Sequence, residues 1–205
     1  NSQIDTFDFT KDQLDALARG FLLAAAGKDS PTDVQKIGPQ VEEFVHKRQD
    51  AYLTKLKAAG QAETDKFFAD LKKKPGVVSL PSGLCYEITK EGTGPNAKPT
   101  DTVKAHYTGT LINGTVFDTS RQPRQPGQPV EPAEFPLDQV IPGWTEGLQK
   151  INKGGSIKLY VPPQLAYGDD GRPGIPPAST LIFDIDVLDI TPTPGPASLA
   201  PALSK

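Results

Sequence analysis

Apolar positions near the start of the chain recur at helical spacing. Between residues 14 and 25 they occupy positions i, i+3, i+4, i+7, i+8 and i+11, which predicts an amphipathic helix. Asp12 is expected to cap the start of this helix and Gly27 to end it. Pro31, behind an N-capping serine, predicts the start of a second, short helix that ends before Pro39.

The segment from Pro39 to about Lys74 predicts one long and strongly charged helix. Its apolar side is a narrow stripe made of Val41, Phe44, Val45, Arg48, Tyr52 and Leu56, continued by Phe67, Phe68 and Leu71. Gly60 weakens the middle of this helix by about 1 kcal/mol relative to alanine, so a kink there is one alternative. The stripe needs a partner, either the preceding helices or a second copy of the chain. We therefore predict a helical region, residues 1–74, that forms a homodimer.

The apolar period changes from helical to alternating after Lys74, where Pro75 and Gly76 end the helix and mark a domain boundary. The strand candidates are Leu84–Thr89, Thr102–Thr108, Thr115–Asp118, Ser156–Val161 and Thr180–Ile190. A short helix is indicated behind Pro142-Gly143, with Trp144 in its first turn. The predicted fold class is α+β, in which the helical region precedes an antiparallel sheet wrapped over one short helix, residues 75–190.

Two proline-rich segments interrupt or follow this pattern. Within residues 121–134 a proline recurs at every third position, the repeat of a polyproline II helix, and a stiff solvated loop is expected. Residues 191–205 have the composition of a disordered tail.

Composition and charge exclude several classes of function. The 22 basic and 25 acidic residues are scattered, which argues against a nucleic-acid partner, because that needs a concentrated basic face. The chain has no apolar run of the roughly 18 residues that a membrane span needs. Cys85 is the single cysteine and is expected to be a buried thiol. The chain has no methionine and begins at Asn1, so we expect a processed, exported protein whose signal peptide has been removed.

Signatures of covalent or metal-assisted catalysis are missing from the sequence. It has no GxSxG, no phosphate-cradling glycine loop, no HExxH and no CxxC, and we expect neither a metal nor a cofactor. His46 lies in the charged helix and His106 in a strand, where a solvated and a packed histidine are expected. Aromatic residues instead gather near turns of the second half. By position alone, Trp144 either fills the core or forms the floor of a pocket.

Five strings follow one another in the second half: His106-Tyr107-Thr108-Gly109, Gly114-Thr115-Val116-Phe117-Asp118, Val140-Ile141-Pro142-Gly143-Trp144, Ala166-Tyr167-Gly168 and Pro173-Gly174-Ile175-Pro176-Pro177. In this order they closely resemble the FK506-binding-protein (FKBP) type of peptidyl-prolyl cis-trans isomerase. The order of helical region, long charged helix and linker resembles the macrophage-infectivity-potentiator class of these isomerases. The resemblance implies a dimer exported to the periplasm or outer-membrane surface of a Gram-negative bacterium. It also implies proline-containing polypeptides as substrates and macrolides of the FK506 and rapamycin type as inhibitors.

Carried over position by position, the resemblance implies a pocket with Trp144 as its floor. The catalytic residues would be Asp118, Tyr167, Phe117 and Tyr107, and the substrate-binding residues would be Trp144, Val140, Ile141, Phe183, Ile175 and Phe135. Three features depart from the family pattern. The proline-rich loop is longer than usual, Arg172 stands where a histidine or a small residue is common, and Cys85 stands where this class often has glutamine, with no functional consequence expected.

The mechanism that these residues imply requires neither a base nor a nucleophile. Rotation about a peptide bond has a barrier of roughly 18–20 kcal/mol because resonance is lost. A dry aromatic pocket disfavours the planar, polar amide relative to the twisted one. The Ile141 N–H and the Tyr167 hydroxyl would hold substrate carbonyls, while Asp118 would orient Tyr107 or the substrate. The alternative is a chaperone or adhesion module that uses the same pocket and the dimer cleft with little catalysis. A purely structural dimer leaves the aromatic residues unexplained.

Overall fold

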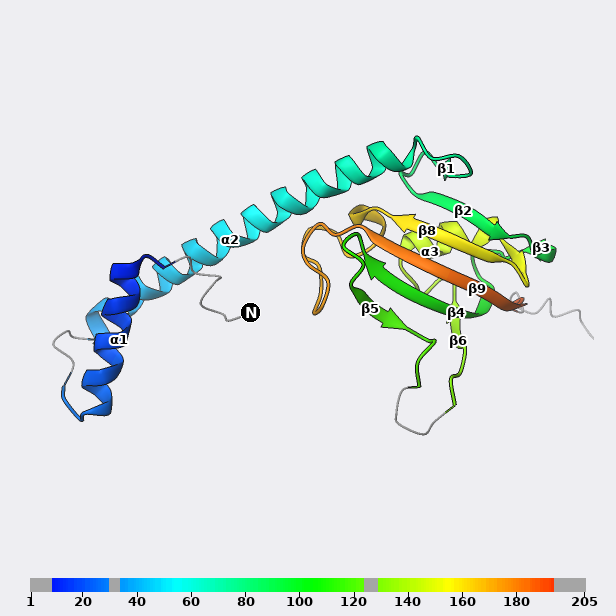
Figure 1. Cartoon of the computed structure of the whole chain (residues 1–205). Helices are drawn as coiled ribbons and strands as arrows, with labels where there is room; N and C mark the ends of the chain where they lie inside the picture. The colour runs from blue at the N-terminus through cyan, green and yellow to red at the C-terminus, as the bar shows by residue number, and fades with distance from the viewer. Residues whose placement is uncertain (1–8, 30–33, 124–128, 194–205) are drawn as a thin grey trace, which may run out of the picture. The chain divides into compact units, whose positions relative to one another are not determined.

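The computed structural model describes residues 9–29, 34–123 and 129–193, in two compact units, residues 1–58 and 59–205 (Figure 1). The first unit holds α1 (Lys11–Ala25) and the beginning of α2 (Val34–Leu71). The second unit holds the end of α2 and an antiparallel sheet with one short α-helix, so the predicted α+β fold is confirmed. Within the described residues, no helix is both long and apolar enough to cross a membrane.

The boundaries of the two long helices differ from the sequence prediction. Thr10, not Asp12, caps α1, because its side chain accepts a hydrogen bond from the Gln13 N–H while Gln13 reaches back to the Thr10 N–H. α2 continues through Pro39, where a break was expected, because a proline close to the helix start removes a single backbone hydrogen bond. The helix start predicted at Pro31 lies outside the described residues.

The main sheet has the strand order β1-β2-β8-β9-β4-β5, with β6 paired to β4 (Figure 1). Its strands are β1 (Val78–Ser79), β2 (Cys85–Lys90), β4 (Thr102–Leu111), β5 (Val116–Thr119), β6 (Ala133–Pro136), β8 (Ser156–Val161) and β9 (Leu181–Thr191). A second sheet pairs β3 (Thr93–Asn96) with β7 (Asn152–Lys153). The five predicted strands are all present. The sequence prediction missed β1, β3, β6 and β7, which have two to four residues and therefore show no alternation.

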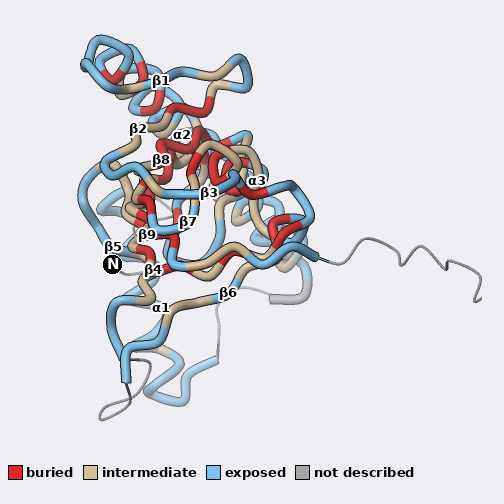
Figure 2. Tube along the Cα trace, turned by 90° about the vertical axis from the view of Figure 1, so that its right-hand side faces the viewer, coloured by how far each residue is buried: buried red, intermediate tan, exposed pale blue. Residues whose placement is uncertain are grey.

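The main core lies between the sheet and the short helix α3 (Pro142–Gly147), which continues as a 3-10 turn, Leu148–Lys150 (buried residues are red in Figure 2). The α3 backbone lies directly on β8. A Cβ at Gly143 would come within 2.4 Å of Val161 Cγ1, and a Cβ at Gly147 within 2.6 Å of Leu159 Cδ2. Glycine at both positions therefore lets the helix approach the sheet closely enough to place Trp144 in the core.

The end of α2 covers the other face of the sheet. Neighbouring strand residues point to opposite faces, so Leu159 faces α3 while Tyr160 packs with Phe68, Leu71 and Cys85. Leu71 and Cys85 are 1% and 0% exposed. Burial and the nearby Glu87 carboxylate raise the pKa of Tyr160 to about 12.

These contacts explain where the sheet unit begins. The sequence pattern suggested a boundary at the end of the helix, residues 74–75, whereas the compact unit begins inside α2, at Ala59. The last turns of α2 therefore belong to the sheet unit by packing, although they continue a helix that starts in the other unit.

Candidate active site

An aromatic pocket of about 420 Å³ lies at the edge of the main core. Its lining comes from β4, β5, β6, β9, α3 and two loops: Tyr107, Phe117, Asp118, Phe135, Gln139, Val140, Ile141, Trp144, Tyr167, Arg172 and Phe183. The fold thus brings together every site residue predicted from the sequence except Ile175. The Ile175 side chain is 4% exposed within the same core cluster, and its backbone pairs with that of Arg172 in a tight loop.

Trp144 lies at the bottom of this pocket, 4% exposed, with three aromatic rings standing upright around its indole. The centroids of Tyr107, Phe135 and Phe183 lie 5.3, 4.8 and 5.1 Å from it, at interplanar angles of 87°, 74° and 84°. Edge-to-face contacts of this kind are favourable, and they keep the walls perpendicular to the floor. The arrangement suits a flat, apolar ring laid on the indole.

The indole N–H adds an unusual feature to the floor. Among the described residues, Trp144 Nε1 is the one buried side-chain nitrogen or oxygen atom without a hydrogen-bond partner. No other described side chain shows this, and the indole is held in place by its three ring contacts.

The turn before α3 positions both the floor and a backbone donor. Pro142 occupies the first turn of the helix, and Ile141 caps it in an extended conformation, with its carbonyl accepting from the Trp144 N–H at 2.9 Å. No hydrogen bond in the described part of the chain uses the Ile141 N–H, and Ile141 lines the pocket. This N–H is thus available to a carbonyl bound above Trp144.

Asp118 and Tyr107 form a hydrogen-bonded pair across β4 and β5. The Tyr107 hydroxyl donates to Asp118 Oδ2 at 2.7 Å, and Asp118 itself is exposed at the pocket rim. The bond fixes the Tyr107 ring against Trp144, which is the orienting contact expected from the sequence. Beside it, Phe117 forms a wall that requires glycine at 109, because a Cβ there would lie 2.6 Å from Phe117 Cζ.

Arg172 holds the Tyr167 hydroxyl, and both residues line the pocket. Arg172 Nη1 donates to the Tyr167 oxygen at 2.8 Å, and Arg172 Cζ lies 4.8 Å from the centre of the Tyr167 ring. Since a guanidinium has no acceptor, the Tyr167 oxygen must be the acceptor, and its own hydrogen remains able to donate to a substrate carbonyl. The sequence marked Arg172 as a departure at the rim without giving it a role, and it missed Gln139. The position of Gln139 directly before the Val140-Ile141 string is the signal that could have identified it.

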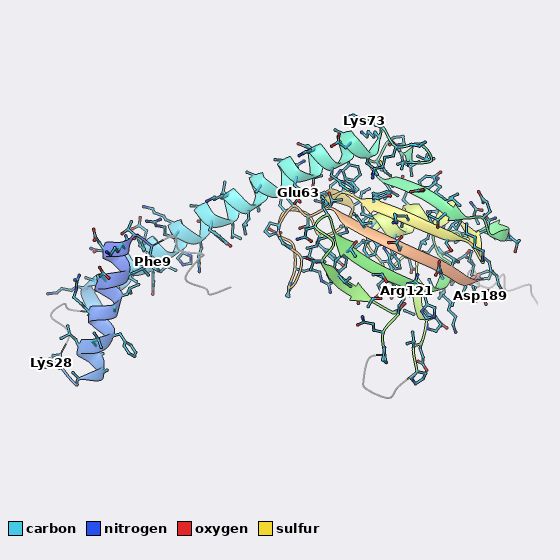
Figure 3. All side chains as sticks on the ribbon, viewed as in Figure 1. Phe9, Lys28, Glu63, Lys73, Arg121 and Asp189 are labelled. Atoms are coloured by element: carbon cyan, nitrogen blue, oxygen red, sulfur yellow. The ribbon has the colours of Figure 1, made fainter. Side chains whose placement is uncertain are left out.

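A second, polar hollow of about 750 Å³ adjoins the aromatic pocket and shares Tyr107, Asp118 and Phe135 with it. The described ends of the loop 121–134 contribute to its lining, while the middle of that loop, residues 124–128, lies outside the described residues, so the expected polyproline II conformation stays a prediction. Arg121, labelled in Figure 3, ties the start of the loop to β9 by an ion pair with Asp186 at 2.9 Å.

Polar contacts connect β4 and the start of the loop 121–134 to the neighbouring strands, through Asp186, His106 and Ser120. Partial burial raises the pKa of Asp186, but hydrogen bonds from Ser156 and Arg121 outweigh it and leave the pKa below its ordinary value. His106 Nδ1 lies 3.2 Å from Ser120 Oγ, so it is packed and hydrogen-bonded. Within the part of the chain that the structure describes, no group of three or more histidines, cysteines, aspartates or glutamates is placed to hold a metal ion.

Comparison with known proteins connects this geometry to a family. The sequence model of the FKBP-type peptidyl-prolyl cis-trans isomerase domain matches residues 94–188. The model of the domain amino-terminal to FKBP-type peptidyl-prolyl isomerase matches residues 3–88. A probable FKBP-type peptidyl-prolyl cis-trans isomerase of Haemophilus influenzae is 47% identical over 169 residues, which are 77% of this chain and 68% of that protein. The chain belongs to the FKBP-type peptidyl-prolyl cis-trans isomerase family.

Other relatives of this FKBP-type chain extend the match into the helical region. FkpA of Escherichia coli is 42% identical over 183 residues, which are 84% of this chain, but the chain spans only 64% of FkpA. The outer membrane protein MIP of Legionella longbeachae is 38% identical over 180 residues, 86% of this chain and 75% of that protein. The crystal structure of E. coli FkpA superposes with a TM-score of 0.74 and covers 91% of this chain and 84% of the FkpA chain.

Proposed function

We propose that this FKBP-type chain accelerates cis-trans isomerisation of X–Pro bonds in unfolded or exported polypeptides. The observation that carries the proposal is the pocket itself, a flat indole floor with upright aromatic walls and a hydrogen-bond donor on either side. A pyrrolidine ring matches the floor in shape and polarity. The Ile141 N–H and the Tyr167 hydroxyl would donate to the carbonyls that flank it, and both donors line the pocket without an acceptor among the described residues.

The pocket lowers the rotational barrier by exclusion of water. In solution, water stabilises the planar amide, which separates charge more than the twisted one does, and the barrier is about 18–20 kcal/mol. Inside an aromatic pocket that stabilisation is lost, and each 1.4 kcal/mol of relative gain for the twisted state gives about a tenfold rate increase. Binding the chain on both sides of proline leaves the X–Pro bond as the one free to rotate.

Each pocket residue has a proposed role in this reaction. Trp144 carries the proline ring, and Phe117, Phe135 and Phe183 exclude water from the rotating bond. Asp118 fixes Tyr107 through the 2.7 Å hydrogen bond. No proton transfer is required of Asp118, since the reaction neither forms nor breaks a covalent bond.

The proposal predicts catalysis that can be blocked at Trp144. The chain should accelerate the isomerisation of a proline tetrapeptide and the proline-limited refolding of a model substrate, and an FK506-type macrolide should inhibit both. Because Trp144 is the single tryptophan, its fluorescence should change over the same macrolide range as the inhibition. Absence of acceleration, or inhibition without a fluorescence change, would contradict the proposal.

We further propose that the helical region, assigned from the sequence to residues 1–74, forms a homodimer. The exposure of large apolar side chains on α1 and α2 supports this proposal. The exposed fraction of these side chains ranges from 37% for Phe44 to 74% for Phe21, and they are Leu14, Leu17, Phe21, Leu22, Val41, Phe44 and Leu53. Phe21→Glu should therefore convert a dimer to a monomer, measured by sedimentation equilibrium, with unchanged turnover of a tetrapeptide. A wild-type monomer would contradict this assignment.

The same exposed apolar side chains favour the second candidate function, in which the helical region holds unfolded clients as a chaperone or adhesion surface. In that case Phe21→Glu should also abolish suppression of client aggregation, while isomerisation persists. An exported location at the periplasm or outer-membrane surface is proposed from the likeness to MIP, and fractionation of the source cells tests it.

A further inference from the structure

The rim residues Tyr167 and Arg172 lie on a loop that closes on itself. The Gly171 N–H donates to the Tyr167 carbonyl at 3.2 Å, and Arg172 and Ile175 exchange backbone hydrogen bonds of 2.9 and 2.8 Å. The end of the loop returns to its beginning, since the Ala178 N–H donates to the Gly168 carbonyl at 3.1 Å. The position of Ala178 therefore controls where the loop holds its rim residues.

Ala178 has a backbone conformation that it would not adopt by itself. Its φ is +53°, in the left-handed region, and it is the only described non-glycine residue with a positive φ. A Cβ makes this region unfavourable, so such a residue persists where its surroundings enforce the conformation. Ala178 is 2% exposed, which means that its surroundings are protein.

α2 supplies those surroundings. Thr64, 5% exposed, donates through Oγ1 to the Ala178 carbonyl at 3.3 Å, and its Oγ1 lies 2.8 Å from that of Thr180, which is 1% exposed. When the Thr64 hydroxyl donates to the Ala178 carbonyl, its oxygen accepts from the Thr180 hydroxyl in the second bond. The two bonds thus join Thr64 of α2 to the last residue of the loop, Ala178, and to Thr180, two residues later.

Gly60 lets the helix come this close. A Cβ at residue 60 would lie 2.7 Å from the Pro177 carbonyl oxygen, 3.0 Å from that of Ala178 and 3.2 Å from the Ala178 Cβ. Two of these atoms are backbone, which cannot swing aside as a side chain can. The glycine that the sequence marked as a weak point of the helix is thus the place where the loop packs against it.

We infer that Thr64 and Gly60 of α2 are positioning residues for the isomerase pocket, because they hold the Ala178 end of the loop that places Tyr167 and Arg172. The inference rests on the proposed isomerase function. Neither residue lines the pocket. Both act through the Tyr167 hydroxyl, a contact that binds the substrate carbonyl in the planar and the twisted state alike, so their loss should raise KM more than it lowers kcat.

Thr64→Val keeps the shape of the side chain and removes both hydrogen bonds. We expect it to raise KM for a proline tetrapeptide about 3- to 10-fold with kcat within about twofold of wild type, since one hydrogen bond to the substrate is weakened. Thr64→Ser, which keeps the hydroxyl, should restore KM. The control is Thr54→Val, the same substitution on an exposed part of α2, where the hydroxyl bonds only within the helix.

A double-mutant cycle separates positioning from a general loss of stability. If Thr64 acts through Tyr167, then Thr64→Val should have no further effect on KM in a Tyr167→Phe background, whereas independent effects would multiply. Thr180→Val removes the bond between the Thr64 and Thr180 hydroxyls and should raise KM in the same way. It therefore replaces Thr64→Val in the test if that variant does not fold. The inference would be overturned if the increases in KM caused by Thr64→Val and Tyr167→Phe multiplied in the double variant, or if Thr64→Val alone left KM unchanged. A wild-type chain without turnover would instead overturn the proposed function.

Discussion

Removal of residues 1–76 is expected to lower the thermal midpoint of the sheet unit by about 10–20 °C, whereas removal of residues 1–58 should change it by a few degrees at most. The reason is the packing of the last turns of α2, where Phe68 and Leu71 are 8% and 1% exposed against the sheet. Burying two such side chains contributes roughly 3–6 kcal/mol to the free energy of unfolding.

The two truncated chains are matched, because they differ only by residues 59–76. Calorimetry of both, compared with full-length protein, measures the contribution of this segment. Leu71→Ala in the chain that starts at residue 59 should reproduce part of this loss of stability, about 2–4 kcal/mol, by leaving a cavity beside Cys85 and Tyr160. If the chain that starts at residue 77 had the same thermal midpoint as the chain that starts at residue 59, the end of α2 would be a linker and no part of the folded unit.

Four of the five strands predicted from the sequence have six or more residues and are long enough to show alternation. Ser156–Val161 and Thr180–Ile190 carry a period of two because one face packs on α3, and they match β8 and β9 closely. β6 has only four residues, and its partner β4 lies about thirty positions earlier in the chain, so no local pattern marks it. The apolar stripe of α2 was recognised, but the partner of its end, at Phe68 and Leu71, is the sheet.

The candidate site likewise has a part that the sequence predicted and a part that it did not. The aromatic residues could be assigned through the family strings, and the structure gathers them in one pocket. The part that the sequence did not describe is the loop 167–178, where Ile175 is 4% exposed and Arg172 donates to the Tyr167 hydroxyl. That loop is shaped by its own backbone hydrogen bonds and by the contact of Ala178 with Thr64, which is 114 positions away in the sequence. No spacing or periodicity encodes such a contact.

Phe117→Ala is expected to lower kcat/KM for X–Pro isomerisation by about 10- to 100-fold, equivalent to roughly 1.4–2.8 kcal/mol of transition-state stabilisation. Phe117 is a wall of the pocket, edge-on to Phe183 with 5.6 Å between ring centroids. Its removal admits water beside the rotating bond, which restores the solvation of the planar amide. A protease-free tetrapeptide assay measures the effect.

Phe67→Ala is the matched control for this loss. Phe67 is also half-buried and meets Phe68 with the same geometry, 5.6 Å and 89°, but it lies against Tyr160, outside the pocket lining. Both variants should lose a similar amount of stability, because each gives up one edge-to-face contact and a half-buried ring. Only Phe117→Ala should lose catalysis, and Phe117→Leu, which keeps an apolar wall, should fall between. If Phe117→Ala and Phe67→Ala lowered kcat/KM equally, Phe117 would affect catalysis through the stability of the fold and not by excluding water from the X–Pro bond.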